Sequence, residues 1–294
     1  MTVIFNNFRG VISTTYLGIN TLFWVSPLFI VTFFRLIIPF KKWGMFCGRI
    51  AVLIAENWVY FNNIGLLVTR NMEFELEGIE ELDRKGSYLV ISNHQSWIDI
   101  PVLQKVFYHK IPFLKFFLKK ELIWVPFLGQ AWWALDFPFM KRYSPSFLKK
   151  NPHLKGKDFE ITKKACEKFK DMPVSVMNFI EGTRFRNEKH KRQKSPYKNL
   201  LRPKAHGISL VLSTMGDQLD YILDVTISYP YGTQEIWSFL CGDVNKVRVK
   251  VQKIPISGDI LCNYSEDRED RIRFQKWLNG LWEKKDEYLE GLKT

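Results

Sequence analysis

The residues best suited to chemistry lie in two short segments, each of which follows an apolar run. In "SNHQSWID" (92–99), His94 and Asp99 are five positions apart, just after the apolar run "YLVI" (88–91). An aspartate bound to one imidazole nitrogen fixes the tautomer and leaves the other nitrogen free to take a proton from a hydroxyl. That is a general base with its orienting group. The spacing alone is common by chance, so a buried structural histidine is an open alternative.

The second segment, "FIEGTRF" (179–185), has the residue types that bind phosphate. Gly182 allows backbone N–H groups to approach a ligand closely. The Thr183 hydroxyl can donate a hydrogen bond, and Arg184 can bind an oxyanion through two N–H groups. Taken by itself, the segment also fits a turn with an exposed salt bridge.

The order of segments after residue 70 predicts the fold that positions these residues. Short apolar runs alternate with charged segments of helical period, and the runs are "MEFELEG", "SYLVIS", "ALDFPFM", "VSVMNFIEG", "YILDVTISYP" and "KVRVKVQKIP". The pattern predicts an α/β fold with a mixed, largely parallel sheet covered by helices. Because parallel strands end at one edge, we expect "NHQSWID", "EGTR" and the basic end of "LDFPFMKR" (135–142) to meet there.

The N-terminal region has a different composition. Residues 10–34 carry no charge and would span about 37 Å as a helix, enough to cross a bilayer. A second apolar stretch is interrupted by charged and amide residues, which favours an interfacial or core helix. Residues 1–69 are therefore predicted to be a hydrophobic helical membrane anchor; a buried hairpin in a soluble protein is the alternative. Lys41, Lys42 and Arg49, against Arg9, favour a cytoplasmic main body.

The composition limits the classes of partner. A net charge of +13 and a pI of about 9.5 indicate an anionic partner, which could be nucleic acid, acidic lipid or a phosphorylated substrate. Most of the excess lies in two basic stretches, 141–157 and 184–204. These stretches hold few aromatic residues, which argues against nucleic acid.

The sequence lacks the motifs of several common enzyme and metal-binding classes. The four cysteines are scattered without a Cys-x-x-Cys pair, so no zinc site or disulfide framework is expected, and a reducing compartment is favoured. The sequence also lacks Gly-x-Ser-x-Gly, Gly-x-Gly-x-x-Gly, P-loop and His-Glu-x-x-His motifs. We expect neither a metal nor a bound cofactor.

Two motifs together resemble those of a known family. "NHQSWID" resembles the Asn-His-x4-Asp motif of the glycerolipid acyltransferases of the lysophosphatidic acid acyltransferase type, and "FIEGTRF" resembles their Glu-Gly-Thr-Arg motif. The order and separation of the motifs also fit, and the resemblance covers about residues 70–230. The sequences of 117–142 and of "DVTISYP" most resemble the lysocardiolipin and lysophosphatidylinositol acyltransferase branch, and within it the bacterial inner-membrane members.

The resemblance implies an acyltransferase domain over residues 70–294, facing the cytoplasm at a bacterial inner membrane. The activity implied is transfer of an acyl chain from acyl-CoA or acyl-acyl carrier protein to the hydroxyl of a lysophospholipid, such as 1-acyl-sn-glycerol 3-phosphate, in phospholipid biosynthesis or remodelling. His94 would be the general base and Asp99 its orienting partner. The substrate-binding residues would be Asn93, Phe139, Arg142, Glu181, Gly182, Thr183 and Arg184.

One position departs from the family pattern. Asp136 stands where the second motif, Gly-x-x-Phe-x-x-Arg, often has glycine. An acid would repel a phosphate unless Lys141 or Arg142 neutralises it, which leaves the acceptor headgroup open. Trp132 and Trp133 are candidates to line an acyl tunnel. The alternatives are a thioesterase that uses the same base on water, a nucleic-acid-binding protein and a catalytically silent lipid-binding scaffold.

Overall fold

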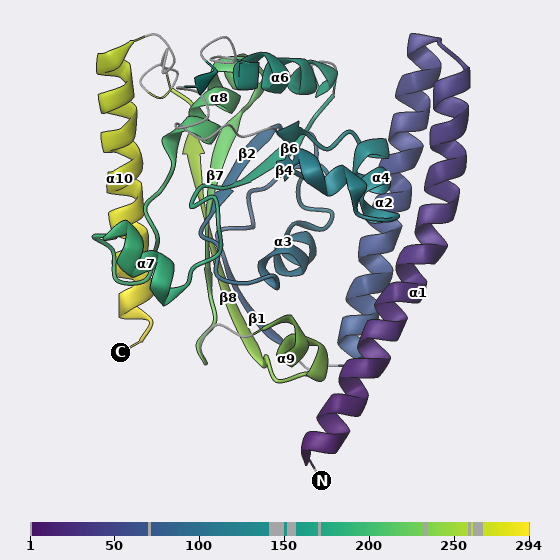
Figure 1. Cartoon of the computed structure of the whole chain (residues 1–294), viewed down its shortest axis with the longest axis horizontal. Helices are drawn as coiled ribbons and strands as arrows, with labels where there is room; N and C mark the ends of the chain where they lie inside the picture. The colour runs from purple at the N-terminus through teal and green to yellow at the C-terminus, as the bar shows by residue number, and fades with distance from the viewer. Residues whose placement is uncertain are drawn as a thin grey trace.

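The computed structural model describes residues 2–69, 72–140, 150–151, 157–169, 172–231, 235–257, 260 and 267–293, and its centre is a six-stranded sheet (Figure 1). The strand order is β1-β8-β7-β2-β6-β3. The strands are β1 (Glu73–Glu77), β2 (Tyr88–Ser92), β3 (Leu114–Phe116), β6 (Ser175–Phe179), β7 (Tyr221–Ser228) and β8 (Lys246–Pro255).

All neighbouring strands of this sheet are parallel except β7 and β8. β2 lies in the middle, where Ile91 pairs with Asn178 of β6 and Asp224 of β7. All of β2 is buried, as expected of an apolar strand covered on both faces. The predicted mixed, largely parallel sheet is therefore confirmed.

Helices cover both faces of the sheet. The helices of the body are α3 (Asp99–Phe107), α4 (Leu128–Ala134), α6 (Lys157–Cys166), α7 (Asn187–Gln193), α8 (Ala205–Met215), α9 (Ile236–Cys241) and α10 (Arg268–Gly291). Short 3-10 helices are η1 (Lys120–Trp124), η3 (Glu167–Phe169) and η4 (Gly216–Gln218). One hydrophobic cluster joins the sheet to α3, α4 and α9, and the other joins it to α6, α8 and α10. The sheet thus separates two cores.

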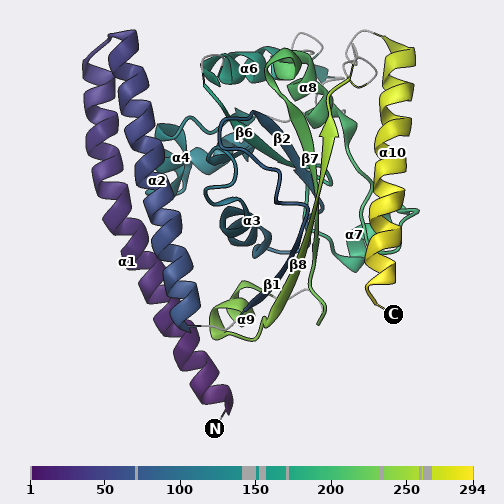
Figure 2. The ribbon, with the colours of Figure 1, turned by 180° about the vertical axis from the view of Figure 1, so that it is seen from behind.

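The N-terminal region forms a hairpin of two long helices, α1 (Thr2–Ile37) and α2 (Lys41–Thr69). Among the described residues, α1 is the one helix long and apolar enough to cross a membrane, and most of its apolar window is not buried. Figures 1 and 2 show the hairpin on one side of the sheet and α10 on the other.

The α1 helix contacts the α/β body near both of its ends. Near the N-terminus, Asn6 donates a hydrogen bond to Asp243 (3.0 Å), and Gly10 lies so close to α9 that a Cβ there would be 2.7 Å from the sulfur of Cys241. Near the C-terminus, Arg35 forms an ion pair with Asp136 (2.8 Å). The helix therefore lies along the body rather than projecting from it (Figure 2).

The ion pairs of Asp136 account for the acid that departs from the family pattern. Its carboxylate binds Arg35 of α1 and Lys168 of η3, the latter at 3.0 Å. Asp136 has a φ of +57°, a left-handed conformation that aspartate tolerates better than most residues. Its two described partners differ from Lys141 and Arg142, the predicted ones, which lie outside the described residues.

We predict that Asp136→Asn lowers the melting temperature by about 2–4 °C, corresponding to about 1 kcal/mol. Burial acts to raise the pKa of Asp136, but Lys168 and Arg35 outweigh it and hold the pKa below its ordinary value of 3.8. A lowered pKa contributes stability above that ordinary value, which is lost as the pH falls through the folded-state pKa. The difference from wild type should therefore shrink in acid, measured by calorimetry.

The exposed Asp217→Asn, in η4, is the matched control and should leave the melting temperature unchanged. An Asp136→Asn protein that melts with wild type at neutral pH would show that these ion pairs contribute nothing.

Candidate active site

The site begins where β2 ends, and Asn93 fastens that end to β7. Its amide nitrogen donates to the carbonyl of Ile227, and its amide oxygen accepts from the N–H of Ile227, both at 2.9 Å. The side chain thus extends the β2–β7 ladder by one step, and it is fully buried. Asn93 supports the loop in this structure, with its amide oriented toward β7 backbone.

Asp99 is the centre of the next turn and the first residue of α3. One carboxylate oxygen lies 2.8 Å from Nδ1 of His94 and accepts the N–H groups of Gln95 and Ser96 at 2.7 and 2.9 Å. The other oxygen accepts the Tyr229 hydroxyl at 2.7 Å. Because donors occupy both oxygens, Nδ1 of His94 donates to Asp99, and Nε2 is left as the proton acceptor.

The chain bends between β2 and α3, and α3 begins at Asp99. The Ser96 hydroxyl accepts the N–H of Ile98 at 3.3 Å, while Asp99 accepts the N–H groups of Gln95 and Ser96. The carboxylate therefore shapes the turn that also carries its histidine.

The imidazole of His94 lies flat against Phe179, the last residue of β6. The ring centres are 3.9 Å apart, the planes differ by 13°, and the histidine side chain is 14% exposed. Further aromatic rings continue from Phe179 through Phe116 to Phe137 at spacings of 6.1 and 6.4 Å. The histidine therefore has a carboxylate at one nitrogen and an apolar wall on its face.

This row of rings ends at an apolar cavity of about 40 Å³ between α1, α2 and α4. Phe137 and Trp132 both line it, together with Trp24 and Trp58 from the hairpin. Of the two tryptophans considered for an acyl tunnel, Trp132 lines this cavity, whereas Trp133 is exposed and does not.

Glu181, just after the end of β6, forms hydrogen bonds to the backbone of two loops. One oxygen accepts the N–H of His94 at 3.1 Å, and the other accepts the N–H of Leu201 at 3.2 Å. The side chain is fully buried, and burial raises the pKa of Glu181 to about 8, although these amides act to lower it. Both oxygens therefore bind backbone rather than facing a ligand.

The backbone carbonyl of His94 also accepts a hydrogen bond, from the loop that follows β6. Gly182 has a φ of +69°, a conformation that favours glycine, and its N–H closes a turn onto the carbonyl of Phe179 at 2.8 Å. The chain then returns so that the N–H of Phe185 donates to the carbonyl of His94 at 2.7 Å. The segment 181–185 thus binds His94 at both its N–H and its C=O.

Thr183 and Arg184 follow on the same loop, beside the His94–Asp99 pair. The Arg184 guanidinium lies over the indole of Trp97, 4.1 Å from the ring centre. Burial lowers the pKa of Arg184, as does Arg186, while Asp99 opposes them. The Lys189 ammonium donates to the Thr183 hydroxyl.

Sequence reasoning missed four residues that the structure brings to the site. They are Trp97, Phe179, Lys189 and Tyr229. Trp97 and Phe179 stand within the two motifs, and Tyr229 ends the run "DVTISY". Their position near motif residues was the signal that the sequence offered. Neither ring stacking nor a hydrogen bond between residues far apart in the sequence has a characteristic spacing.

The strand of the third segment does not join the main sheet, contrary to expectation, whereas the basic end expected beside the other two motifs (Lys141 and Arg142) lies outside the described residues, so its position stays a prediction. Phe139–Met140 forms β5, which pairs only with β4 (Leu118–Lys119) in a separate two-stranded sheet. A two-residue strand after the left-handed turn at Asp136 is too short to extend the main sheet. Phe139 is half-buried, and Arg142 lies outside the described residues. In the described part of the chain, no His, Cys, Asp and Glu side chains cluster as a metal site would need.

Residues 73–228 match the family model described as Acyltransferase. The chain is 22% identical to 1-acyl-sn-glycerol-3-phosphate acyltransferase 3 of Arabidopsis thaliana, over 86% of this chain and 70% of that protein. It is 27% identical to lysocardiolipin acyltransferase 1 of Mus musculus, over 69% and 53%. It is 24% identical to 2-acyl-1-lysophosphatidylinositol acyltransferase of Saccharomyces cerevisiae, over 70% and 61%. The chain thus spans between about half and 70% of these relatives.

A solved structure has the same fold over nearly all of the chain. The 1-acyl-sn-glycerophosphate (LPA) acyltransferase PlsC of Thermotoga maritima aligns with a TM-score of 0.58 and 18% identity, over 98% of each chain. The likeness includes the two N-terminal helices as well as the sheet, because so little of either chain is left out.

We predict that above pH 8, where the carboxyl of Glu181 is ionised, Glu181→Gln destabilises the fold by about 1–3 kcal/mol, because a glutamine amide places an NH₂ group against one of two backbone N–H donors. Thermal unfolding measures the loss. Hydrogen exchange should become faster in the segments 93–95 and 199–202, which the two bonds connect. The exposed Glu188→Gln on α7 is the control. Equal stability and equal exchange in the two variants would contradict the bonding assigned to Glu181.

Proposed function

The chain belongs to the Acyltransferase family, and we propose that it transfers a fatty acyl chain from acyl-CoA or acyl-acyl carrier protein to the free hydroxyl of a lysophospholipid. The observation that carries the proposal is the hydrogen bond between His94 and Asp99, which leaves Nε2 of His94 as a base beside Arg184. A base and a cation at neighbouring strand ends suit a hydroxyl acceptor that also carries a phosphate.

The chemistry needs no covalent enzyme intermediate, because a thioester is already activated. Nε2 of His94 takes the proton of the acceptor hydroxyl as its oxygen attacks the thioester carbonyl. The new C–O bond forms, the C–S bond breaks, and the departing thiolate takes the proton from the imidazolium. Asp99 stabilises the imidazolium between these steps, and Tyr229 holds Asp99 from its other oxygen.

Arg184 and Thr183 are proposed to bind the acceptor phosphate. Stacking on Trp97 restricts the Arg184 guanidinium to one plane, which leaves its N–H groups free to bind phosphate oxygens in pairs. The names of the relatives supply the acceptor class, since lysophosphatidate, lysocardiolipin and lysophosphatidylinositol all carry phosphate beside a free hydroxyl. Asn93 and Glu181 are proposed to act on the acceptor only through the loops they hold.

The acyl chain of the donor is proposed to follow the row of aromatic rings away from His94. Phe179, Phe116 and Phe137 are in sequence along this path, and the apolar cavity at Trp132 lies at its end. An apolar path that starts at the base fits the fatty chain of a thioester, whereas the opposite, cationic side fits phosphate.

The chain is further proposed to act at the cytoplasmic face of a bacterial inner membrane, with the α1–α2 hairpin in one leaflet. Support comes from the contacts of α1, since Asn6 and Arg35 near its two ends both bind the α/β body. A helix that crossed the bilayer alone would separate one of these ends from the body. The net charge of +13 suits an anionic leaflet.

We predict that His94→Ala lowers kcat by about 10²–10⁴-fold, because the acceptor hydroxyl then lacks its base. The measurement is acyl transfer by purified protein to a panel of lysophospholipids, with CoA and carrier-protein donors. His109→Ala, with an exposed ring near Glu56, is the matched control. Undiminished transfer by His94→Ala would overturn the base assignment. Thiol release that does not depend on any acceptor would instead favour a thioesterase.

We predict that Arg184→Gln raises the acceptor KM by about tenfold or more, with a smaller effect on the donor KM, because a charge-assisted phosphate contact is lost. The same assay, with acceptor varied at saturating donor, measures both constants. Arg271→Gln on the exposed face of α10 controls for loss of a charge. An acceptor KM equal to that of wild type would remove Arg184 from the phosphate site.

A further inference from the structure

A second cation, Lys189 of α7, lies against the two residues proposed to bind the acceptor phosphate. The Lys189 ammonium donates one hydrogen bond to the hydroxyl of Thr183 and another to the carbonyl of Arg184, the latter at 3.3 Å. The contacts join the first turn of α7 to the loop that follows β6. Lys189 therefore lies at the phosphate subsite, although no family motif contains it.

These contacts leave three kinds of donor for a ligand. Because the ammonium donates to the oxygen of Thr183, the hydroxyl proton of Thr183 is directed toward another acceptor. An ammonium has three N–H groups, and the contacts of Lys189 use two of them. The guanidinium of Arg184 is stacked on Trp97 and donates no hydrogen bond within the described part of the chain. A hydroxyl, an ammonium and a guanidinium thus adjoin one another.

Neither cation has a carboxylate that balances it. Among the described residues, Arg184 and Lys189 form no ion pair, and both are partly buried. Residues 184–194 include six lysines and arginines but one acid, Glu188, which is exposed. Asp99 favours the charge of Arg184, but its carboxylate already accepts four hydrogen bonds. Burial lowers the pKa of Lys189, and so do four neighbouring cations, which are Arg186, Arg184, Arg192 and Lys119. An anionic ligand would relieve this repulsion.

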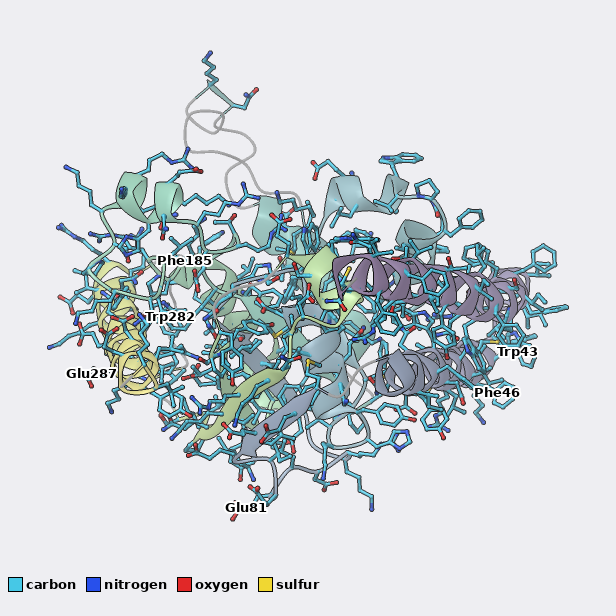
Figure 3. The ribbon with its side chains drawn as sticks, turned by 90° about the horizontal axis from the view of Figure 1, so that it is seen from below. Trp43, Phe46, Glu81, Phe185, Trp282 and Glu287 are labelled. Carbon is cyan, nitrogen blue, oxygen red and sulfur yellow. The ribbon has the colours of Figure 1, made fainter. Side chains whose placement is uncertain are left out.

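The loop holds this group of donors near the base. Both ends of the segment 181–185 bind the backbone of His94, so the two phosphate-binding residues inside the segment stay beside it. In Figure 3, Phe185 lies toward α10, on the side away from Trp43 and Phe46 of the hairpin. The cations therefore lie away from the apolar path that leads toward the hairpin.

α7 is itself fixed where it carries Lys189. The ring of His190 lies 5.7 Å from the ring of Phe185, and its Nε2 is 2.6 Å from the carbonyl oxygen of Tyr197. The N–H of His190 also donates to the carbonyl of Arg186 at 2.9 Å. Because Lys189 precedes His190, its backbone is placed by these bonds before a ligand binds.

We propose that Lys189 binds the acceptor phosphate together with Thr183 and Arg184, and that it selects a phosphomonoester headgroup over a phosphodiester. A phosphomonoester has three terminal oxygens and about 1.5–2 negative charges at pH 7. A phosphodiester has two terminal oxygens and a single charge. Two cations and a hydroxyl match the monoester in both charge and number of acceptors. The proposal rests on the proposed function, because it names the acceptor class of the same site.

The test compares two acceptors with the same acyl chain as substrates of Lys189→Gln. They are 1-oleoyl-sn-glycerol 3-phosphate, a monoester, and 1-oleoyl-lysophosphatidylglycerol, a diester. A glutamine amide can still donate to the Thr183 hydroxyl, so the variant removes mainly the charge. We expect kcat/KM to fall about tenfold for the monoester, through KM, and about twofold or less for the diester. Lys189→Arg should restore the preference.

Lys191→Gln is the matched control, because it removes the same charge from an exposed position of the same helix. It should leave the ratio of the two kcat/KM values as it is in wild type. Equal losses for monoester and diester in Lys189→Gln would overturn the proposal. The same change of the ratio in Lys191→Gln would also overturn it, since the effect would then belong to the net charge of α7.

Acyl-CoA carries a phosphomonoester of its own, the 3′-phosphate of its ribose, and a donor experiment distinguishes the two sources. The donor KM is measured with acyl-CoA and with acyl-dephospho-CoA, which lacks that phosphate. We expect Lys189→Gln to leave both donor constants near those of wild type. A donor KM that rises for acyl-CoA alone would assign Lys189 to the donor and overturn the proposal.

Thermal unfolding tests the same binding without activity. sn-Glycerol 3-phosphate, a monoester, should raise the melting temperature of wild type and Lys191→Gln more than sn-glycero-3-phosphoinositol, a diester, because a ligand stabilises the state that binds it. The difference should be lost in Lys189→Gln. Equal shifts in wild type and Lys189→Gln would refute the role of Lys189. A wild-type protein that shows the difference but transfers no acyl chain would refute the proposed function alone.

Discussion

The arrangement of the site depends on the carboxylate of Asp99, which is fully buried and accepts four hydrogen bonds. Two donors are backbone amides that make the turn, one is the imidazole that the turn carries, and one is the hydroxyl of Tyr229 at the end of β7. The same anion therefore folds the loop, sets the tautomer of His94 and joins two strand ends. Removing it would leave several buried donors unsatisfied at once.

Near this anion, a row of aromatic rings and a buried ion pair lie on opposite faces of the sheet. Phe179 and Phe116, on the face of α3 and the hairpin, lie between His94 and an apolar core. Lys285 of α10 and Asp224 of β7 form an ion pair on the opposite face. Both motifs follow strands at the middle of the sheet, β2 and β6.

Much of the fold could be predicted from the sequence, because strands and helices follow local periodicity. The alternation of apolar runs and helical segments indicated a mostly parallel sheet, and its edge placed His94, Asp99 and Arg184 close together. Bonds between distant segments have no such signature. Asn93 and Glu181 look like ligand-binding residues in a motif, yet both bind backbone, and Tyr229 reaches Asp99 across a long sequence separation. The short run at Phe139 had strand composition but too little length for the main sheet, and Asp136 binds Arg35 of α1 and Lys168 of η3, which are distant in the sequence.

The contacts of α1 near its two ends have a geometric consequence. A helix of 36 residues is about 54 Å long, comparable with the body it lies on. Asn6 and Arg35 are bound to points near opposite ends of that length, so the body has no freedom to pivot about the helix. Any surface that takes up the exposed side of α1 therefore also sets the tilt of the sheet and the height of His94 above that surface. The position of His94 relative to the exposed side of α1 is therefore set by the fold.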